Sequence, residues 1–236
     1  MTLALTHLIG FASGASTGVG NDAFTVSLLH CDGVDTSTTF SDSAAGGTHT
    51  WTAFGNAQVD TAEAKFGGSA LFDGSGDYVS TPDSVDWTFG SGDWTVDLWF
   101  NRSGGDGTFR RLLANTNATG TDWTIRISLS DTNVVQATGN GLLWLVAGTT
   151  TITTTGWHHV AVVRTGNTIK LFVDGVQEGG DQATSGAASD SAGAMTVGRN
   201  GDVNTGFWTG WLDEIRISKG VARWTANFTP PIAPYG

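Results

Sequence analysis

The chain has 236 residues, which suffices for one large β domain or two small ones, and we favour one. It contains 34 glycines and many β-branched and aromatic residues but few strong helix formers, a composition that favours an all-β fold. Its net charge of −11 argues against a nucleic-acid-binding face and fits a solvated acidic surface or calcium sites. The single cysteine, Cys31, excludes an internal disulfide, and no apolar run approaches the roughly 18 residues of a membrane span.

Residues 1–24 form an apolar segment punctuated by glycines. The segment imitates a signal peptide, but no Lys or Arg precedes its apolar run, and Thr6 and His7 interrupt that run. The glycines disfavour a helix, so we expect an extended N-terminal arm that docks on another protein. We expect one domain to follow over residues 25–236.

Beyond this arm, the sequence predicts a series of short strands separated by turn residues. We expect strands near residues 24–30, 66–72, 78–80, 94–100, 109–114, 123–129, 141–147, 149–153, 156–164, 169–173, 195–198 and 208–218, with shorter ones near 38–40 and 51–54. Residues 178–193 are predicted as a long polar loop and residues 224–236 as an irregular, proline-rich strap. This many short strands indicates a β-sandwich.

The predicted strand at residues 208–218 carries an acidic residue that needs an explanation. Strict alternation places Asp213 on the same side as Trp211, Ile215 and Ile217. A carboxylate on an apolar face is costly unless it is paired, hydrogen-bonded or metal-bound. Arg216, the N–H groups of a backbone turn or a bound cation could each compensate the negative charge of Asp213. The bound cation is the most specific of these three hypotheses.

Five blocks occur in one order along the chain: FGGSALFDGSGDYV (66–79), GDWTVDLWF (92–100), GWHHVAVVR (156–164), IKLFVDG (169–175) and GWLDEIRI (210–217). Over residues 25–230 this pattern resembles the laminin G-like branch of concanavalin A-like domains. The resemblance implies a jelly-roll sandwich of two curved antiparallel sheets, in proteins that are mostly binding or structural modules and often carry calcium. The flanking blocks LLHCDG (28–33) and VARWTANFTPP (221–231) most resemble copies in virion proteins of tailed bacteriophages.

Two aspartates are the candidate ligands for a structural Ca²⁺ ion. Asp32 ends the first strand and Asp213 lies in a late one, and the terminal strands of a jelly roll can be neighbours. The family resemblance places an ion near Asp213. The alternative is that Asp213 accepts backbone N–H groups and Asp32 caps a turn. For a second acidic group, Asp73, Asp77 and Asp83, the turn explanation is stronger.

Ten tryptophans make glycan binding a second hypothesis, because sugars stack on aromatic faces beside polar groups. Trp99, Trp123 and Trp208 are the candidate ligand-binding residues, and Trp144 and Trp224 are further candidates for exposure. The alternative for each is a place in the core, where most tryptophans lie.

Catalysis has less support from the sequence. Glycoside hydrolases need two carboxylates about 5–9 Å apart. In the family that this chain resembles, the enzyme branch carries a Glu-x-Asp-x-x-Glu pattern on one strand. Here Asp213 and Glu214 are expected to face opposite ways, and so are His158 and His159. We therefore expect a protein that is not an enzyme.

The leading hypothesis is a non-enzymatic structural protein of a virion surface, in a capsid decoration, a head fibre or a tail, with a lectin-like domain. Residues 1–24 would bind other virion proteins, a host-surface glycan is the candidate ligand, and we expect a homo-oligomer that contacts neither nucleic acid nor membrane. A calcium-dependent carbohydrate-binding adhesin, which could be extracellular, is the alternative, and a glycoside hydrolase is the third hypothesis.

Overall fold

The computed structural model describes residues 20–236 except 105–106, 118, 121–122, 140–143 and 154–155, so most of the predicted arm lies outside the described residues. The described chain forms fifteen strands and one short 3₁₀ turn, η1 (Val85–Trp87). The strands are β1 (Thr25–Leu29), β2 (Thr52–Phe54), β3 (Gln58–Asp60), β4 (Ser69–Asp73), β5 (Tyr78–Thr81), β6 (Trp94–Arg102), β7 (Arg110–Thr116), β8 (Trp123–Leu129), β9 (Val134–Gly139), β10 (Trp144–Thr151), β11 (Trp157–Thr165), β12 (Thr168–Val173), β13 (Val176–Ala183), β14 (Met195–Val197) and β15 (Thr209–Lys219).

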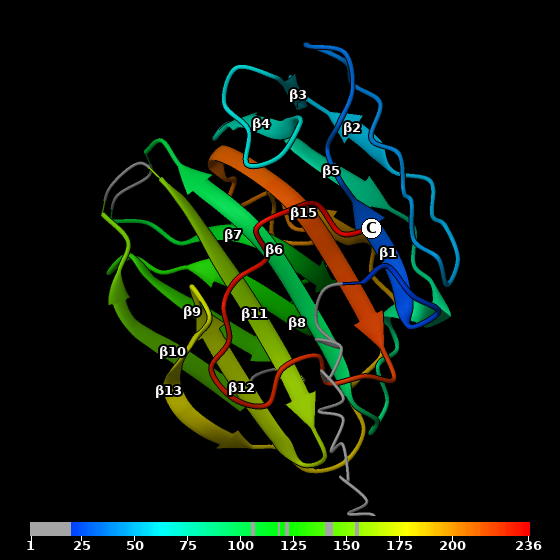
Figure 1. The fold of residues 1–236 in the computed structure, drawn as a ribbon, viewed down its shortest axis with the longest axis vertical. Helices are drawn as coiled ribbons and strands as arrows, with labels where there is room; N and C mark the ends of the chain where they lie inside the picture. The colour runs from blue at the N-terminus through cyan, green and yellow to red at the C-terminus, as the bar shows by residue number, and fades with distance from the viewer. Residues whose placement is uncertain (1–19, 105–106, 118, 121–122, 140–143, 154–155) are drawn as a thin grey trace, which may run out of the picture.

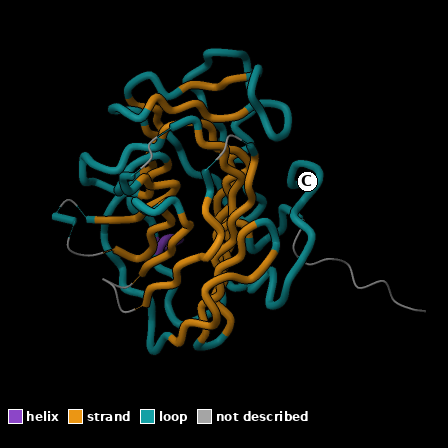
Figure 2. The backbone as a smooth tube through the Cα atoms, turned by 90° about the vertical axis from the view of Figure 1, so that its left-hand side faces the viewer, coloured by secondary structure: helices purple, strands orange, loops and turns teal. Residues whose placement is uncertain are grey.

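The strands build two antiparallel sheets that pack face to face (Figures 1 and 2). Sheet A has the order β13-β12-β11-β6-β15-β4-β3, with β1 paired to β15, and sheet B has the order β10-β9-β8-β7-β14-β5-β2. The structure therefore confirms the predicted all-β sandwich of two antiparallel sheets.

The predicted strands differ from the observed ones mainly where a strand is short or polar. β3 and β9 were not expected, and β13 occupies part of the segment predicted as a loop. β13 is an edge strand with mostly exposed residues, and its Gly179 and Gly180 both have φ of +71°. Such a strand lacks the apolar alternation by which a sequence reveals a half-buried strand.

The core lies between the sheets and follows the alternation of side chains along each strand. In β6, Val96, Leu98 and Phe100 are fully buried members of this core, whereas Asp97 and Trp99 point to the outer face of sheet A.

The C-terminal segment crosses the outer face of sheet A, as the red trace in Figure 1 shows. Its residues from 220 onward form no strand, and Trp224 and Phe228 pack on Phe172 and its neighbours in β11. The first described residues lie against the same segment, because Asn21 donates its N–H to the carbonyl of Gly236 at 2.7 Å. The predicted strap is thus part of the fold.

Among the described residues, the structure contains no helix with the length and hydrophobicity to cross a membrane.

Candidate functional site

A β-bulge in β15 changes which residues of this strand face outward. Glu214 has a positive φ of +49°, and the register with β6 shifts between Asp213 and Arg216. As a result, Ile215 points into the core, while Asp213 and Arg216 both lie on the outer face opposite Trp99 and Asp97. The expectation that Asp213 shares a side with Ile215 and Ile217 is therefore wrong, because one extra residue breaks the alternation.

Asp213 is fully buried beneath the loop between β3 and β4. Its Oδ2 accepts the backbone N–H of Phe66 at 2.9 Å, and its Oδ1 accepts that of Glu214 at 2.7 Å. Burial, with the nearby negative charges of Glu214 and Asp32, raises the pKa of Asp213 to about 9 despite these two hydrogen bonds. Without a compensating cation, Asp213 holds a proton at neutral pH.

Asp32 lies near Asp213, as the sequence predicted, because β1 pairs with β15. Its Oδ1 accepts the backbone N–H of Gly68 at 2.7 Å. Gly67 has a φ of +63°, and a Cβ atom there would lie 2.2 Å from Asp32 Oδ1. The two aspartates thus hold the β3–β4 loop, and glycine is required where the loop passes the Asp32 carboxylate.

The described residues do not provide a complete calcium site at this point. No group of three or more His, Cys, Asp or Glu side chains in the described part of the chain is arranged to hold a metal ion. Three carboxylate oxygens of Asp32 and Asp213 already accept backbone N–H groups, whereas Ca²⁺ takes about 6–8 oxygen ligands. This donor set does not fit the ion as it stands, and calcium binding stays a prediction.

The tryptophans that the sequence singled out are not available as exposed platforms. Trp99 is 5 % exposed and lies under the ammonium group of Lys65, 3.9 Å from its ring centroid. Trp208 is 1 % exposed and packs against Phe100. The predicted exposure of Trp99 and Trp208 is wrong, because Lys65 covers Trp99 on the outer face of sheet A and Trp208 belongs to the core between the sheets. The side chain of Trp123 lies outside the described residues.

The two further candidates for exposure, Trp144 and Trp224, are also buried. Trp144 belongs to the core between the sheets, and Trp224, which is part of the C-terminal segment, stacks on Phe228 of the same segment.

Two tryptophans that sequence reasoning missed are partly exposed on the outer face of sheet A. Trp157 begins β11 and Trp211 lies near the start of β15, and both are opposite Asn101 of β6 in the ladder. Because neighbouring strands lie about 4.8 Å apart, the backbones of the two tryptophans are about 10 Å apart, with Asn101 between them. Figure 1 shows the three strands side by side, with β6 in the middle.

Carboxylates fix the polar edges of both indoles. Glu63 Oε1 accepts hydrogen bonds from Trp157 Nε1 at 3.0 Å and from Asn101 Nδ2 at 2.9 Å. Asp60 Oδ2 accepts one from Trp211 Nε1 at 2.9 Å. We call Trp157, Trp211, Asn101, Glu63 and Asp60 the tryptophan platform. It combines two oriented aromatic rings with polar groups, the combination typical of small-molecule binding sites.

The sequence contained one signal for this platform. Trp157 follows a glycine at the start of its strand, and Trp211 follows Gly210 near the start of its own, whereas Trp99 lies in the middle of a strand. Residues near the ends of strands lie at the rim of a sandwich, where side chains are less often covered. The contribution of Glu63 and Asp60 had no such signal, because it depends on how the β3–β4 loop folds.

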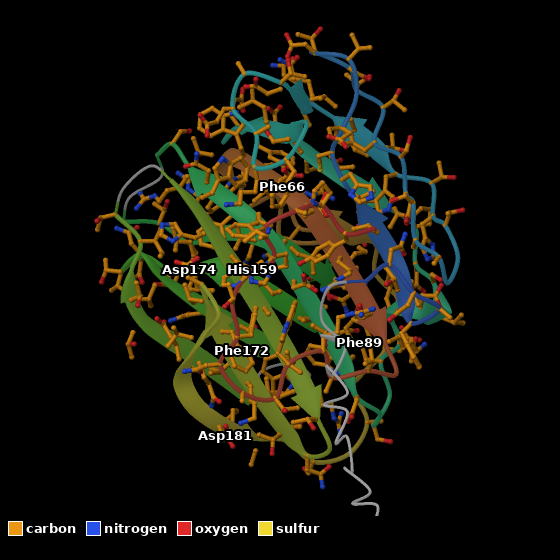
Figure 3. The ribbon with its side chains drawn as sticks, viewed as in Figure 1. Phe66, Phe89, His159, Phe172, Asp174 and Asp181 are labelled. Carbon is orange, nitrogen blue, oxygen red and sulfur yellow. The ribbon has the colours of Figure 1, made fainter. Side chains whose placement is uncertain are left out.

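A buried polar network lies on the same face, beneath the C-terminal segment. Asp97 accepts hydrogen bonds from Arg216 Nε at 3.0 Å and from the Tyr235 hydroxyl, and His159 Nε2 lies 3.5 Å from its Oδ2. Burial by itself would raise the pKa of Asp97, but Arg216, His159 and Tyr235 bring it below its usual value. His159, labelled in Figure 3, is fully buried. This network therefore anchors the C-terminal segment and offers no exposed acid or base.

His158 and His159 face opposite ways, as predicted. His158 lies beside Phe100 and places its Nδ1 2.7 Å from an oxygen of Asp174, while His159 contacts Trp99 and Trp224 on the outer side. The two histidines cannot serve one site.

Three solved structures illustrate what this fold is similar to. Domain 4 of AbnA, a GH43 extracellular arabinanase from Geobacillus stearothermophilus in complex with arabinotriose, matches with a TM-score of 0.58 and 20 % identity over 84 % of this chain and 93 % of that one. The binding domain of Paraclostridial Mosquitocidal Protein 1 matches with a TM-score of 0.63 and 14 % identity over 89 % of this chain and 51 % of that one.

A structure of botulinum neurotoxin type C, whose cell entry depends on interaction with two ganglioside molecules, matches with a TM-score of 0.60 and 12 % identity over 86 % of this chain and 49 % of that one. The chain thus spans about half the length of the two toxin chains. At these identities the likeness concerns the fold, which is that of lectin-like domains. No curated protein matches the sequence.

A family model, Laminin_G_3, described as the concanavalin A-like lectin/glucanases superfamily, matches residues 73–225, which is more than half of the chain. This range includes the paired strands β6, β11 and β15, which carry Asn101, Trp157 and Trp211 of the tryptophan platform. The chain belongs to the concanavalin A-like lectin/glucanases superfamily.

Proposed function

We propose that this domain is a non-enzymatic carbohydrate-binding module and that the tryptophan platform is its binding site. The observation that carries the proposal is the pair of partly exposed tryptophans, Trp157 and Trp211, on either side of Asn101. A sugar ring presents C–H groups on its faces and hydroxyls at its edge. The C–H groups stack on the faces of the aromatic rings, and the hydroxyls form hydrogen bonds with the polar groups between the rings.

The carboxylate of Glu63 is the group that could receive sugar hydroxyls. Its Oε1 accepts bonds from Trp157 and Asn101, while its Oε2 has no hydrogen-bond partner among the described residues. A free carboxylate oxygen beside two fixed rings can accept a hydroxyl proton in a charge-assisted hydrogen bond. The neighbouring structures support this proposal, since one of them is a domain in complex with arabinotriose.

The state of the acidic side chains supports a binding role over hydrolysis. A glycosidase needs one carboxyl group with a raised pKa to protonate the leaving group. Burial by itself would raise the pKa of Asp60, but hydrogen bonds from Trp211 and two backbone N–H groups together outweigh it and lower the pKa below its usual value. Asp213, whose pKa is raised, lies buried beneath the loop that carries Phe66, where no substrate reaches it.

A screen of the purified full-length protein on a glycan array tests this proposal, with Trp157→Ala and Trp211→Ala measured beside it. We expect specific binding of an oligosaccharide that both substitutions weaken. Phe54→Ala is the matched control, because it removes a partly exposed aromatic ring from sheet B. Absence of binding by folded protein, or equal weakening by the control, would contradict the proposal.

We propose further that the protein works at a virion surface, with residues 1–24 binding other virion proteins. The support is the similarity of residues 28–33 and 221–231 to bacteriophage virion proteins. Both segments have defined places in the fold: Asp32 holds the β3–β4 loop and Trp224 covers sheet A. Removal of residues 1–19 is expected to leave a folded domain that no longer associates with particles, and association at full-length levels would contradict this proposal.

A further inference from the structure

The two carboxylates of the tryptophan platform, Asp60 and Glu63, carry negative charge that no cationic side chain neutralises. Among the described residues, no Lys, Arg or His forms an ion pair with either of them. Their hydrogen bonds come from indole, amide and backbone N–H groups instead. A third carboxylate, Asp35, adjoins the same loop, because it accepts the backbone N–H of Thr61 at 3.1 Å. The platform is therefore a negatively charged surface.

Both indoles of the platform offer their faces rather than their N–H groups to a ligand. The Nε1 groups of Trp157 and Trp211 already donate to Glu63 and Asp60, so these N–H groups are not free for a sugar. The face of an aromatic ring attracts cations, and tryptophan attracts them most strongly. A carboxylate that accepts the Nε1 hydrogen bond polarises the ring in the same sense. The rings and the carboxylates thus favour the same kind of ligand, a positively charged one.

The protein itself places one ammonium group on an indole of this face. Lys65 Nζ lies 3.9 Å from the ring centroid of Trp99 and 5.6 Å from that of Phe66. No carboxylate in the described part of the chain forms an ion pair with Lys65, so the aromatic rings hold this cation without one. Trp99 precedes Asn101 by two residues in β6, which places it about 7 Å along the strand from the platform.

The charge of Lys65 opposes a second cation, but the charges of the platform exceed it. Lys65 contributes one positive charge over Trp99, whereas two carboxylates contact the platform indoles directly. Because the interaction of two charges falls with distance, the nearer carboxylates dominate at the platform. The net charge of −11 acts in the same direction and attracts cations at long range.

We propose, building on the carbohydrate-binding role proposed above, that the tryptophan platform selects an amino sugar, whose ammonium group contacts an indole face and donates a hydrogen bond to Oε2 of Glu63. A charge-assisted bond from an ammonium group is stronger than the bond from a neutral hydroxyl to the same oxygen. Neutral sugars therefore bind the same site more weakly. Sugars that carry a carboxylate or a sulfate are repelled by the two platform carboxylates.

Isothermal titration of the full-length protein in weakly acidic buffer tests the proposal with three β-linked tetrasaccharides that differ at carbon 2. Tetraglucosamine carries an ammonium group there, chitotetraose an acetamido group and cellotetraose a hydroxyl. We expect tetraglucosamine to bind at least about tenfold more tightly than either neutral probe, and added salt to weaken its binding. If tetraglucosamine does not bind, or if a neutral probe binds as tightly, the amino-sugar proposal is wrong. The carbohydrate-binding role stands in that case if both Trp157→Ala and Trp211→Ala weaken a neutral glycan.

Variants separate the platform from the general attraction between an acidic protein and a cationic sugar. Glu63→Gln removes the charge between the rings and should weaken tetraglucosamine at least about tenfold. Asp131→Asn is the matched control, because it removes an exposed carboxylate from the turn between β8 and β9, and it should not weaken binding. Equal effects of these two variants would overturn the amino-sugar proposal. Undiminished tetraglucosamine binding by both Trp157→Ala and Trp211→Ala would contradict the platform itself. The comparison of probes uses the wild-type protein, so it decides the question even if Glu63→Gln fails to fold.

Discussion

Asp213 in β15 accepts a hydrogen bond from the backbone N–H of Phe66 across a sequence separation of 147 residues. This contact ties the β3–β4 loop to sheet A. The same loop supplies Glu63 to the tryptophan platform, and Asp60, the last residue of β3, directly precedes the loop. The buried Asp213 thus fixes the position of the β3–β4 loop through this hydrogen bond. The arrangement of the proposed site therefore depends on a residue that no ligand touches.

The pKa of Asp213 predicts how stability depends on pH. The folded protein keeps the proton up to about pH 9, whereas the unfolded chain loses it near its ordinary pKa of 3.8. Between these values the folded state binds more protons, so the free energy of unfolding falls as pH rises, by at most about 1.4 kcal/mol per pH unit. Urea titrations between about pH 5 and pH 8, roughly the middle of that window, measure the slope.

Asp213→Asn is the matched variant for this measurement. An amide keeps the shape of the carboxyl group but does not titrate, so the variant should show a flatter dependence of stability on pH than the wild type. An unchanged slope in Asp213→Asn would show that other groups produce the dependence.

The response to calcium separates two explanations for Asp213. Three oxygens of Asp213 and Asp32 already accept backbone N–H groups, so we expect a chelator to leave the melting temperature unchanged. An ion that binds only the folded state must raise stability. A rise in melting temperature on adding Ca²⁺, present in the wild type and lost in Asp213→Asn, would restore the calcium hypothesis.

Gly67→Ala should destabilise the β3–β4 loop more than an ordinary glycine substitution. Gly67 and Gly76 both have positive φ, but a Cβ atom at Gly67 meets Asp32 Oδ1 at 2.2 Å, whereas one at Gly76 meets nothing within 4 Å. Gly76→Ala should cost about 1 kcal/mol from backbone strain, and Gly67→Ala about 1–3 kcal/mol more. Chemical denaturation of both variants measures the difference, and equal losses would contradict the role of Asp32.

Tyr235→Phe should loosen the C-terminal segment from sheet A. The substitution removes the hydroxyl that donates to Asp97, a fully buried carboxylate, and such a loss costs about 1–3 kcal/mol. We expect lower stability and faster proteolysis near residue 235, with glycan binding retained at the tryptophan platform. Wild-type stability in Tyr235→Phe would show that the apolar contacts of Trp224 and Phe228 suffice to hold the segment.

The sequence predicted the sandwich because apolar alternation and turn residues mark its strands, and the order of five blocks carried the family resemblance. It did not predict the bulge at Glu214, because nothing in the residues Asp-Glu-Ile-Arg reveals an inserted position. This one bulge moved Asp213 and Arg216 to the outer face.

The candidate site was less predictable than the fold. Trp99 and Trp208 are covered by Lys65 and Phe100, which come from other parts of the chain, and no local pattern shows such coverage. Trp157 and Trp211 meet at Asn101 only through the strand order of sheet A. Exposure of a tryptophan depends on tertiary contacts, so a single sequence identifies the candidates but not the pair.

The most direct test of the central claim is a two-dimensional NMR titration that observes the indole N–H signals of the tryptophans. The ligand would be the neutral oligosaccharide that binds most tightly on the glycan array, and the signals of Trp157 and Trp211 would be assigned from the variants Trp157→Phe and Trp211→Phe. We predict that these two signals shift most, because their Nε1 groups bond to Glu63 and Asp60 within the site. Shifts confined to other indoles, with Trp157 and Trp211 unmoved at saturation, would contradict the tryptophan platform as the binding site.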